Sequence, residues 1–291
     1  MAITLGGGGS ASQINEVILL NNAANTVTLA DGRVYLKGGV FETNPSTYPL
    51  ASSLMQQAGI NFSVAAQNAF PLGITWDGTH YWVVGNPNDR AYKYTSAGVY
   101  TGTSFSTLSQ MSIPYGIVWD GSFFWVLGSG GSGSNSVFKY NSAGVYQNVA
   151  WSSHTQAGTT SYDIAWDGSH FWVTSSVSPT AYKYNSSGAY QNVSFDFSAQ
   201  MTSAGGITWD GTYFWVAGMT KDEIFKYNSS GVYQDVSFSV ANYEPNPFGL
   251  DWDGTHLVLV GNQNDKVWQF RDAVGVGSAT SLGGQNYVRV A

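Results

Sequence analysis

The tripeptide Trp-Asp-Gly occurs five times in this chain, and it limits what the chain can fold into more than any other feature. Its copies begin at Trp76, Trp119, Trp166, Trp209 and Trp252, at spacings of 43, 47, 43 and 43 residues. A period of this length predicts a radial or stacked array of repeats, not a globular domain built around a single site. The repeat itself then accounts for most aromatic, Asp and His residues. Function is therefore to be sought where the copies differ and outside them.

Each copy contains four short segments with the character of β-strands. In the second copy, an apolar run ends at Trp119 and meets Asp120-Gly121, a dipeptide that predicts a two-residue type I′ turn, in which both residues have positive φ. Three further segments follow, separated by turns rich in Gly, Ser and Asn: 122–127, 137–140 and 145–150. Four antiparallel strands in about 43 residues predict one blade of a β-propeller.

The second segment of each copy is apolar on both faces, as in 81–84 and 171–173. A sheet with one face in solvent would alternate apolar and polar residues, whereas a blade is covered on both sides by its neighbours. We therefore predict an all-β protein, a five-bladed β-propeller of four-stranded antiparallel blades over residues 58–272.

The last copy lacks a fourth segment, because the chain leaves the pattern at Arg271. Residues 58–67, ahead of the first copy, align with the fourth segment of the preceding repeat, 230–241. We predict that 58–67 supplies the missing outer strand of the last blade and closes the ring, which removes an open sheet edge.

Residues 1–57 do not match the repeat. Within them, 26–29 and 33–37 flank an Asp-Gly pair and predict a hairpin, and 43–50 carries two Pro residues that predict a linker. We predict a small β-containing N-terminal module that attaches the propeller to something else. The tail, 273–291, is predicted to end in a strand.

The two ends of the chain resemble the ends of bacteriophage tail-fibre and other virion proteins. The resemblance is carried by the Gly-rich opening after Met1-Ala2, by Ala30-Asp-Gly-Arg-Val-Tyr-Leu-Lys-Gly-Gly39 and by Asn286-Tyr-Val-Arg-Val290. The central repeats resemble five-bladed propellers of the tachylectin type in repeat length and aromatic strands, but the sugar-contact residues of that family do not map onto this chain position by position. The resemblance implies a tail fibre or spike that joins other virion proteins through residues 1–57 and forms a homo-oligomer in the particle.

Composition argues against several classes of partner. Charged residues make up 10% of the chain, the net charge is −7, and Lys and Arg form no cluster, which argues against binding to nucleic acid and to anionic membranes. With no Cys, disulfides and Cys-based zinc sites are excluded. The N-terminus has no signal-peptide pattern and no apolar run could span a bilayer, so we expect synthesis in a host cytoplasm, no membrane insertion and a place in a virion.

Most residues with reactive side chains recur in the repeat, which favours structural roles. His80, His170 and His256 share one repeat position that holds Phe or Tyr in the other copies, which indicates packing rather than metal binding. Four copies place a Lys in the third segment, where its aliphatic stem can cover apolar surface, and Gln269 stands there in the fifth. No phosphate-binding loop or nucleophile elbow is present. We predict no catalytic residue, no metal site and no cofactor.

The connections between second and third segments vary from copy to copy, and in a propeller they lie on the same face as the links between blades. A rigid scaffold with one variable face is a usual layout for binding. Asn, Asp and aromatic side chains on such a face would suit a carbohydrate, because planar polar groups bond to hydroxyls and rings stack on sugar faces. The predicted ligand-binding residues on this variable face are Asn86, Asn88, Asp89, Arg90, Asn135, Lys221, Asp222, Asn262, Asn264 and Asp265.

We predict a non-enzymatic virion protein whose propeller binds a host-surface glycan or receptor. An alternative is a glycoside hydrolase that degrades host polysaccharide, because Asp163, Glu244 and Asp251 depart from the repeat and could form a carboxylate pair near the central channel. A third reading is a purely structural decoration protein.

Overall fold

The computed structural model describes residues 2–3, 17–18, 26–29, 34–37, 55–57, 60–130, 135–157, 161–175, 178–272, 280–282 and 285–290. The chain divides into two compact units. One unit is 57–271, and the other combines 1–56 with 272–291.

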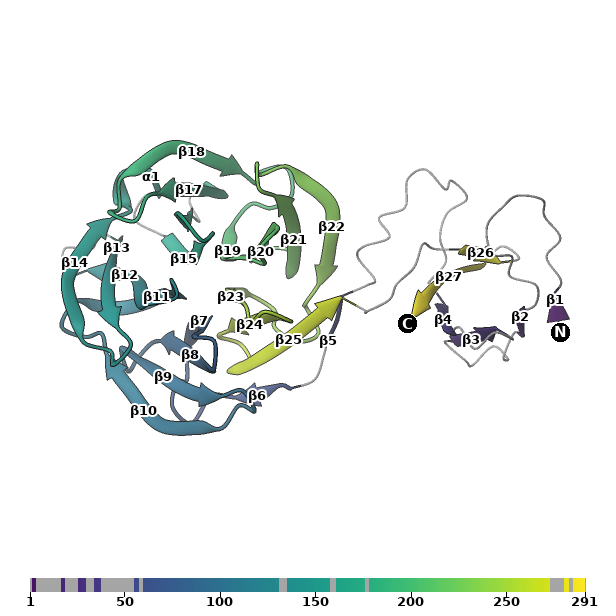
Figure 1. The fold of residues 1–291 in the computed structure, drawn as a ribbon, viewed down its shortest axis with the longest axis horizontal. Coiled ribbons are helices and arrows are strands. Elements are labelled where there is room, and N and C mark those ends of the chain that lie inside the picture. The colour runs from purple at the N-terminus through teal and green to yellow at the C-terminus, as the bar shows by residue number, and fades with distance from the viewer. Residues whose placement is uncertain are drawn as a thin grey trace. The chain divides into compact units, whose positions relative to one another are not determined.

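Unit 57–271 is a ring of five antiparallel sheets around a central axis (Figure 1). The innermost strands of blades one to five are β7 (Pro71–Trp76), β11 (Met111–Trp119), β15 (Ser161–Trp166), β19 (Ala204–Trp209) and β23 (Pro247–Trp252). The second strands are β8 (His80–Gly85), β12 (Phe123–Gly130), β16 (Phe171–Ser175), β20 (Tyr213–Gly218) and β24 (Leu257–Gly261). The third strands are β9 (Arg90–Thr95), β13 (Asn135–Asn141), β17 (Thr180–Tyr184), β21 (Glu223–Asn228) and β25 (Lys266–Asp272).

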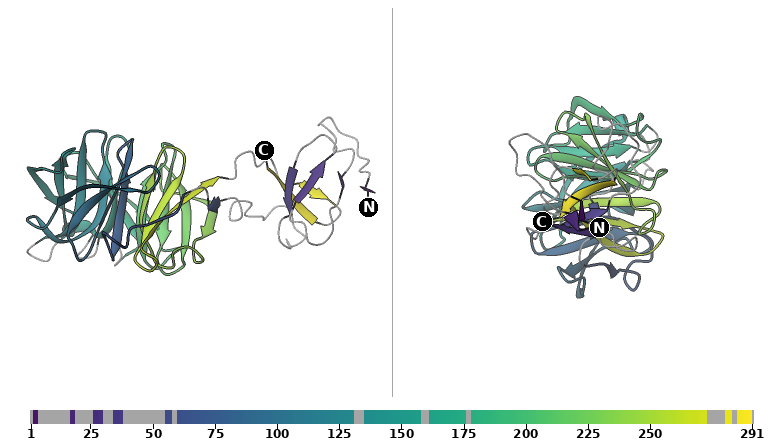
Figure 2. Two further views of the ribbon diagram at one scale, coloured as in Figure 1. Left: turned by 90° about the horizontal axis from the view of Figure 1, so that it is seen from below. Right: turned by 90° about the vertical axis from the view of Figure 1, so that its right-hand side faces the viewer.

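The fourth strands form the outer wall of the ring. Blades one to four take theirs from the same repeat: β10 (Tyr100–Ser106), β14 (Tyr146–Ser152), β18 (Tyr190–Asp196) and β22 (Tyr233–Ser239). Strands follow one another from the axis outwards in each blade, and Figure 2 shows the same ring from the side. One short helix, α1 (His154–Ala157), follows β14 among the described residues. The predicted five-bladed propeller of four-stranded antiparallel blades is confirmed.

The Trp-Asp-Gly turn differs from the predicted type I′ turn. Positive φ falls on the glycine of each motif, from +92° to +96°, and not on the aspartate before it. In blade one, the N–H of Asp77 bonds to the carbonyl of His80, so the two residues at the tip are Gly78 and Thr79. The aspartate instead uses its side chain, because Oδ1 accepts hydrogen bonds from the N–H groups of Thr79 and His80.

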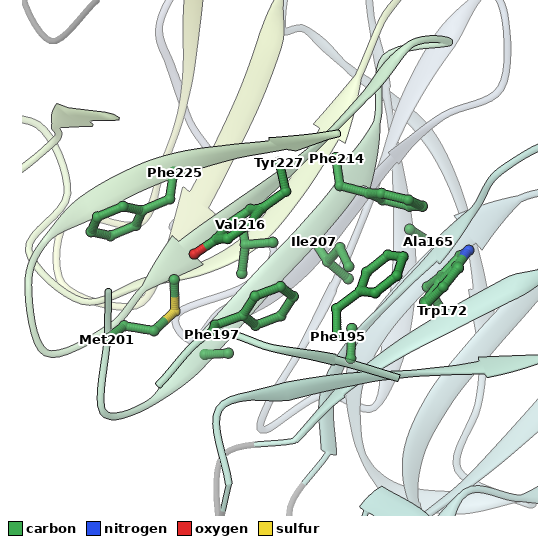
Figure 3. Close-up of a cluster of buried hydrophobic side chains, with 12 residues drawn as sticks. Ala165, Trp172, Phe195, Phe197, Met201, Ile207, Phe214, Val216, Phe225 and Tyr227 are labelled. Carbon is green, nitrogen blue, oxygen red and sulfur yellow. The ribbon is translucent and has the colours of Figure 1, made fainter. Parts of the chain in front are cut away.

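The core lies between adjacent blades, and we call each such contact a seam. Figure 3 shows the seam of blades three and four, where the ring of Trp172 packs on Phe195 and Phe214, with centroids 4.2 and 5.1 Å apart. Side chains from both blades are buried there, which explains why the second strands carry apolar residues on both faces. Burying a large aromatic contributes a few kcal/mol by area.

The ring closes with a segment from ahead of the first blade, residues 55–63, which we call the closing segment. Its strands β5 (Met55–Gln57) and β6 (Phe62–Ser63) both pair with β25 of blade five, and β6 lies within the stretch predicted to do so. Phe62 occupies the place of Phe105, Trp151 and Phe195 in the other blades: a Cβ on Gly98 of the neighbouring turn would lie 2.3 Å from Phe62, as one on Gly144 would from Phe105.

The other unit contains a six-stranded sheet of order β1-β2-β3-β4-β27-β26. Its strands are β1 (Ala2–Ile3), β2 (Val17–Ile18), β3 (Thr26–Leu29), β4 (Val34–Lys37), β26 (Thr280–Leu282) and β27 (Gln285–Val290). The hairpin expected from the N-terminal sequence is formed by β3 and β4, and the expected tail strand is β27, which pairs with β4. The predicted linker, 43–50, lies outside the described residues.

Candidate functional site

In four blades, the aspartate of the Trp-Asp-Gly motif anchors a tryptophan of the second strand. In blade one, the Trp82 indole N–H donates to Asp77 Oδ2 at 2.7 Å. Blades two, three and four repeat the bond at 2.6, 2.8 and 2.8 Å, with Trp125, Trp172 and Trp215 as donors. Burial acts to raise the pKa of Asp77, but bonds from Trp82, Thr79 and His80 together hold that pKa below its ordinary value. The motif aspartates therefore serve as anchors for seam tryptophans.

The same four blades place a lysine beside that tryptophan. Nζ of Lys93 lies 5.2 Å from the ring centre of Trp82, and Nζ of Lys183 lies 5.3 Å from that of Trp172. Lys139 and Lys226 lie over Trp125 and Trp215 in the same way, at 5.1 and 4.8 Å. These distances fit cation–π contacts. Each of the four blades therefore carries its own ammonium group on the seam aromatic.

Blade five lacks both partners. In the strand pairing, Val258 faces Gln269, where blade one pairs Trp82 with Lys93. The indole and the ammonium are thus replaced by a small apolar side chain and a neutral amide. The seam between blades five and one is built differently from the other four.

Tyr81 of blade one compensates for the missing indole. Its hydroxyl donates to Asp253 Oδ2 at 2.6 Å, the atom that bonds to an indole N–H in the other blades. Gln269 Nε2 donates to the Tyr81 hydroxyl at 2.7 Å, and Gln269 Oε1 accepts from the N–H of Ile60 in the closing segment at 3.2 Å. His256 Nδ1 lies 3.2 Å from Asp253 Oδ2. One network therefore joins both blades and the closing segment.

A cavity of about 330 Å³ opens at this seam, on the face that carries the Trp-Asp-Gly turns. We call it the seam cavity. Its lining residues come from three places: Trp76, Tyr81, Ser96 and Ala97 of blade one, Asp253, Thr255, His256 and Gln269 of blade five, and Ile60 of the closing segment. Gln269, which lines the cavity, pairs across the strands with Val258, a smaller side chain than the tryptophan at that position in the other blades.

The cavity combines largely apolar walls with several polar groups, one of which is acidic. Burial, and then the hydrogen bond to Asp253 with its negative charge, raise the pKa of Tyr81, so Tyr81 remains a neutral donor at physiological pH. Asp253 is the one carboxylate in the lining, and no Lys or Arg accompanies it. The Trp76 ring, packed on Tyr81 at a centroid distance of 4.6 Å, gives the cavity an aromatic wall.

The predicted binding residues on the variable face mainly hold the propeller together. Asn88 Nδ2 donates to the carbonyl of Gln67, and Asn264 Nδ2 donates to that of Tyr243, so both link their loops to the preceding blade connection. Asn135 is buried and donates to the carbonyl of Ser161 in the next blade. Arg90 donates through Nε and Nη2 to the Ser104 hydroxyl on the adjacent strand.

The remaining predicted residues divide between turn structure and open surface. Asp89, Asp222 and Asp265 all have positive φ. Their carbonyls accept the N–H groups of Thr107, Val240 and Val64, each the first residue after an outer strand. Asn262 accepts a bond from Asn246, whereas Asn86 is partly exposed and Lys221 is exposed. The described residues thus place these ten around the rim as loop supports, and whether they contact a ligand stays a prediction.

Of the three carboxylates that depart from the repeat, Asp163 lies on the innermost strand of blade three, β15, and bonds to two other blades. The other blades place Gly73, Gly116, Gly206 and Gly249 at this position, where inner strands approach so closely that an added Cβ would lie under 3 Å from neighbouring atoms. Asp163 is fully buried, and its Oδ2 accepts the N–H groups of Ile207 in blade four and Leu250 in blade five at 3.1 and 3.2 Å. Burial raises its pKa well above the ordinary value.

Asp251 and Glu244 also bind backbone N–H groups. Asp251 Oδ2 accepts the N–H of Trp76 at 2.5 Å, and its Oδ1 accepts the hydroxyl of Thr208, so the carboxylate links blades four, five and one. Glu244 lies in the connection before β23 and accepts the N–H groups of Gln263 and Asn264. Burial raises the pKa of each to about 7. Glu244 contacts a loop that neither aspartate reaches, so the three do not assemble into one set.

Sequence reasoning missed the seam cavity, although the signal was present. Gln269 is easily seen to replace the repeated lysine. The second change, Val258 in place of tryptophan, becomes apparent only when the five copies are aligned. The contribution of Tyr81 depends on contact between the first and last blades, which no single repeat reveals. Within the part of the chain that the structure describes, no group of three His, Asp or Glu side chains could hold a metal ion, and no helix could cross a membrane.

Comparison with known proteins identifies the fold and no more. No family model and no curated protein sequence matches the chain. Among solved structures, the glutaminyl cyclase of Myxococcus xanthus is similar over 75% of this chain and 95% of its own, with 10% identity and a TM-score of 0.55. The virginiamycin B lyase of Staphylococcus aureus aligns over 89% of this chain and 84% of its own, with 15% identity and a TM-score of 0.46. These likenesses give no support to the phage or tachylectin resemblance. At 10% identity, the likeness to the glutaminyl cyclase supports a β-propeller fold and nothing further.

Proposed function

We propose that the chain is a non-enzymatic carbohydrate-binding propeller and that its sugar site is the seam cavity. The observation that carries this proposal is the departure of blade five from the other blades at Val258 and Gln269, together with a cavity at the same seam that Gln269 lines. If the substitutions in blade five served only to close the ring, we would expect side chains to fill the seam completely. Here the seam keeps an aromatic wall and a set of polar groups around open space.

The lining suits a sugar better than an apolar ligand. A pyranose presents C–H groups on one face and hydroxyls around its edge, so it needs one aromatic surface and several planar or hydroxyl partners. Trp76 supplies the surface, and Asp253, Gln269, Thr255 and Ser96 supply donors and acceptors. Ligand sites commonly combine an apolar wall with a few placed polar groups, and aromatic rings attract polarised C–H edges through their negative faces.

The hydrolase alternative has less support from the geometry. Glycoside hydrolysis uses two carboxyl groups that flank the scissile bond, about 5 to 9.5 Å apart and both in contact with substrate or water. Asp163 is fully buried and bonded to N–H groups of two other blades, so it does not meet this condition. The enzymes among the structural neighbours share 10 to 15% identity with this chain and lend it no activity.

The wider setting we propose is a phage fibre or spike, with the propeller displayed in several copies. This part rests on the resemblance of the chain ends to virion proteins. The presence of a separate unit built from both chain ends agrees with an attachment module, since its sheet joins β4 to β27. Weak sugar contacts gain strength from such multivalent display.

The test is a glycan array probed with the full chain, followed by titration calorimetry on the sugars that bind. Replacing Trp76 by Ala should weaken binding at least tenfold, about 1.4 kcal/mol, because the aromatic wall is lost. Trp166→Ala is the matched control, because Trp166 holds the same repeat position in blade three and does not line the cavity.

Binding that survives Trp76→Ala and Trp166→Ala equally would exclude the seam cavity as the site. A parallel assay for released reducing ends separates the hydrolase alternative. Sugar release that disappears in Asp251→Asn would replace the binding proposal with an enzymatic one. If the chain binds no glycan and releases no sugar, a purely structural decoration protein becomes the favoured hypothesis.

A further inference from the structure

We propose that the sugar held in the seam cavity carries a free ammonium group, as an unacetylated hexosamine does. The inference rests on the proposed function and deepens it, because it names the charged group that the cavity selects. It follows from a comparison of blade five with the four blades that hold an ammonium of their own.

The seams after blades one, two and three combine three elements around one tryptophan: the motif carboxylate at the indole N–H, the lysine ammonium over the ring, and an aromatic ring of the next blade. The seam after blade four keeps the first two, with Leu257 at the position of that aromatic ring. In blade two the three elements are Asp120, bonded to Trp125 at 2.6 Å, Lys139 over the ring at 5.1 Å, and Phe171 of blade three at 4.8 Å. The ammonium thus lies over an aromatic ring whose N–H donates to a carboxylate.

At the seam cavity the acidic group and the aromatic rings remain, but the ammonium is absent. Asp253 is present, and Trp76 and Tyr81 line the space, while Gln269 replaces the lysine. Blade five does contain Lys266, but its Nζ lies over Trp268, which does not line the cavity. A ligand ammonium would therefore restore the group that the repeat provides elsewhere.

The electrostatics of the cavity favour a cation. Asp253 Oδ2 bonds to the Tyr81 hydroxyl and the Gln269 amide, which are neutral, and lies 3.2 Å from His256 Nδ1, so the carboxylate charge is uncompensated while that imidazole is neutral. The raised pKa of Tyr81 keeps that hydroxyl from becoming an anion, and the lining contains no Lys or Arg. Opposite charges attract more strongly in a partly desolvated site than in bulk water, and an ammonium over an aromatic face gains further.

An acetylated amine would lose this advantage. N-acetylation removes the charge and adds bulk at the atom that would approach Asp253, while glucose replaces the ammonium with a neutral hydroxyl. The remaining sugar hydroxyls would find Ser96 and Thr255 at the cavity wall in all three sugars. The three therefore differ mainly in the group that the inference concerns.

Titration calorimetry of the full chain with glucosamine, glucose and N-acetylglucosamine tests this at about pH 7, where most of the sugar amine is protonated and an ordinary imidazole is mostly neutral. We expect glucosamine to bind at least tenfold more tightly than either neutral sugar, with a preference that shrinks as salt is added. If the two neutral sugars bind as tightly as glucosamine, the inference is wrong, but the proposed function still stands. If none of the three sugars nor any glycan on the array binds, the proposed function fails and the inference fails with it.

Two variants sharpen the test. Gln269→Lys returns the resident ammonium and should abolish the preference for glucosamine, whereas Lys183→Gln, the opposite change at the same position of blade three, should leave it intact. Gln269 also bonds to the closing segment, so its substitution could disturb the fold. Asp253→Asn therefore provides a second, independent variant. It should reduce the ratio of glucosamine to glucose affinity towards one, and an unchanged ratio in both seam variants would contradict the inference.

Discussion

Four seams of the propeller and the fifth solve the same packing problem with different side chains. In the four regular seams, an indole bonded to the motif aspartate fills the space between blades, with Trp172 and Asp167 as one example. In the fifth, the smaller Val258 stands in place of the indole, and the Tyr81 hydroxyl of blade one donates a hydrogen bond to Asp253 across the seam. The comparison separates two roles of the seam tryptophan, hydrogen bonding and filling volume. The fifth seam restores the first role and omits the second.

The fifth seam also depends on a strand from elsewhere in the chain. If Phe62 does for blade five what Phe195 does for blade three, Phe62→Ala and Phe195→Ala should each cost about 4 kcal/mol of unfolding free energy, because each deletes a buried aromatic side chain. Urea denaturation of the propeller followed by tryptophan fluorescence measures both. A cost below about 1 kcal/mol for Phe62→Ala alone would show that the closing segment contributes little.

The inner strand of blade five differs from the others in carrying Asp251, whose pKa burial raises from 3.8 to about 7. Because the folded state keeps the proton to a higher pH than the unfolded state does, stability from this group is fully present below about pH 4. It falls by about 1.4 kcal/mol per pH unit until about pH 7 and is constant above that. Asp251→Asn should remove this slope. Parallel stability profiles of the two proteins between pH 4 and 7 would contradict the assignment.

The arrangement of the fifth seam can be transplanted to a regular one. Trp125→Val in blade two should cost about 3 kcal/mol, because it opens a cavity and leaves Asp120 Oδ2 without its indole partner. Adding Phe171→Tyr, which recreates the pair found at the fifth seam, should recover about 1 kcal/mol through a new hydrogen bond to Asp120. Chemical denaturation of the single and double variants measures the recovery, with Phe171→Tyr alone as control. No recovery would mean that the fifth seam owes its stability to other contacts.

The smallest effect concerns the lysines of the regular seams. Lys183→Gln removes the ammonium from the face of Trp172 and should lower stability by about 0.5 to 1 kcal/mol. The difference in thermal unfolding between this variant and wild type should shrink in high salt. A larger, salt-independent loss would indicate that the aliphatic stem of the lysine matters more than its charge.

The ring was predictable from sequence because its rules are local and repeated. The Trp-Asp-Gly copies, the two-sided apolar strands and the likeness of residues 58–67 to an outer strand together specify five blades and point to how they close. The turn geometry was wrong by one residue, since an Asp side chain that accepts two N–H groups displaces the positive φ onto glycine alone. The dipeptide Asp-Gly alone does not show whether the Asp will adopt positive φ or will bind the turn with its side chain.

The candidate site was less accessible, because it arises from contacts between residues far apart in the chain. Gln269 is visible as an exception, but Tyr81 lies 188 residues away and acquires its role only when the ring closes. The variable loops attracted attention by their sequence diversity, yet Asn88, Asn135 and Asn264 bond to neighbouring backbone. Loops can therefore differ in sequence because each blade needs different hydrogen bonds to its neighbours, and not only because a ligand binds there.

The pairing of β4 with β27 has a consequence for biosynthesis. It joins residues near the start of the chain, 34–37, to residues at its very end, 287–290, so the whole propeller is an insertion between two neighbouring strands of one sheet. That sheet cannot be completed until residues 287–290 leave the ribosome, whereas the blades can form as they emerge. A nascent chain would therefore present an unpaired strand edge for most of its synthesis, and premature termination would yield a wheel without a finished terminal sheet.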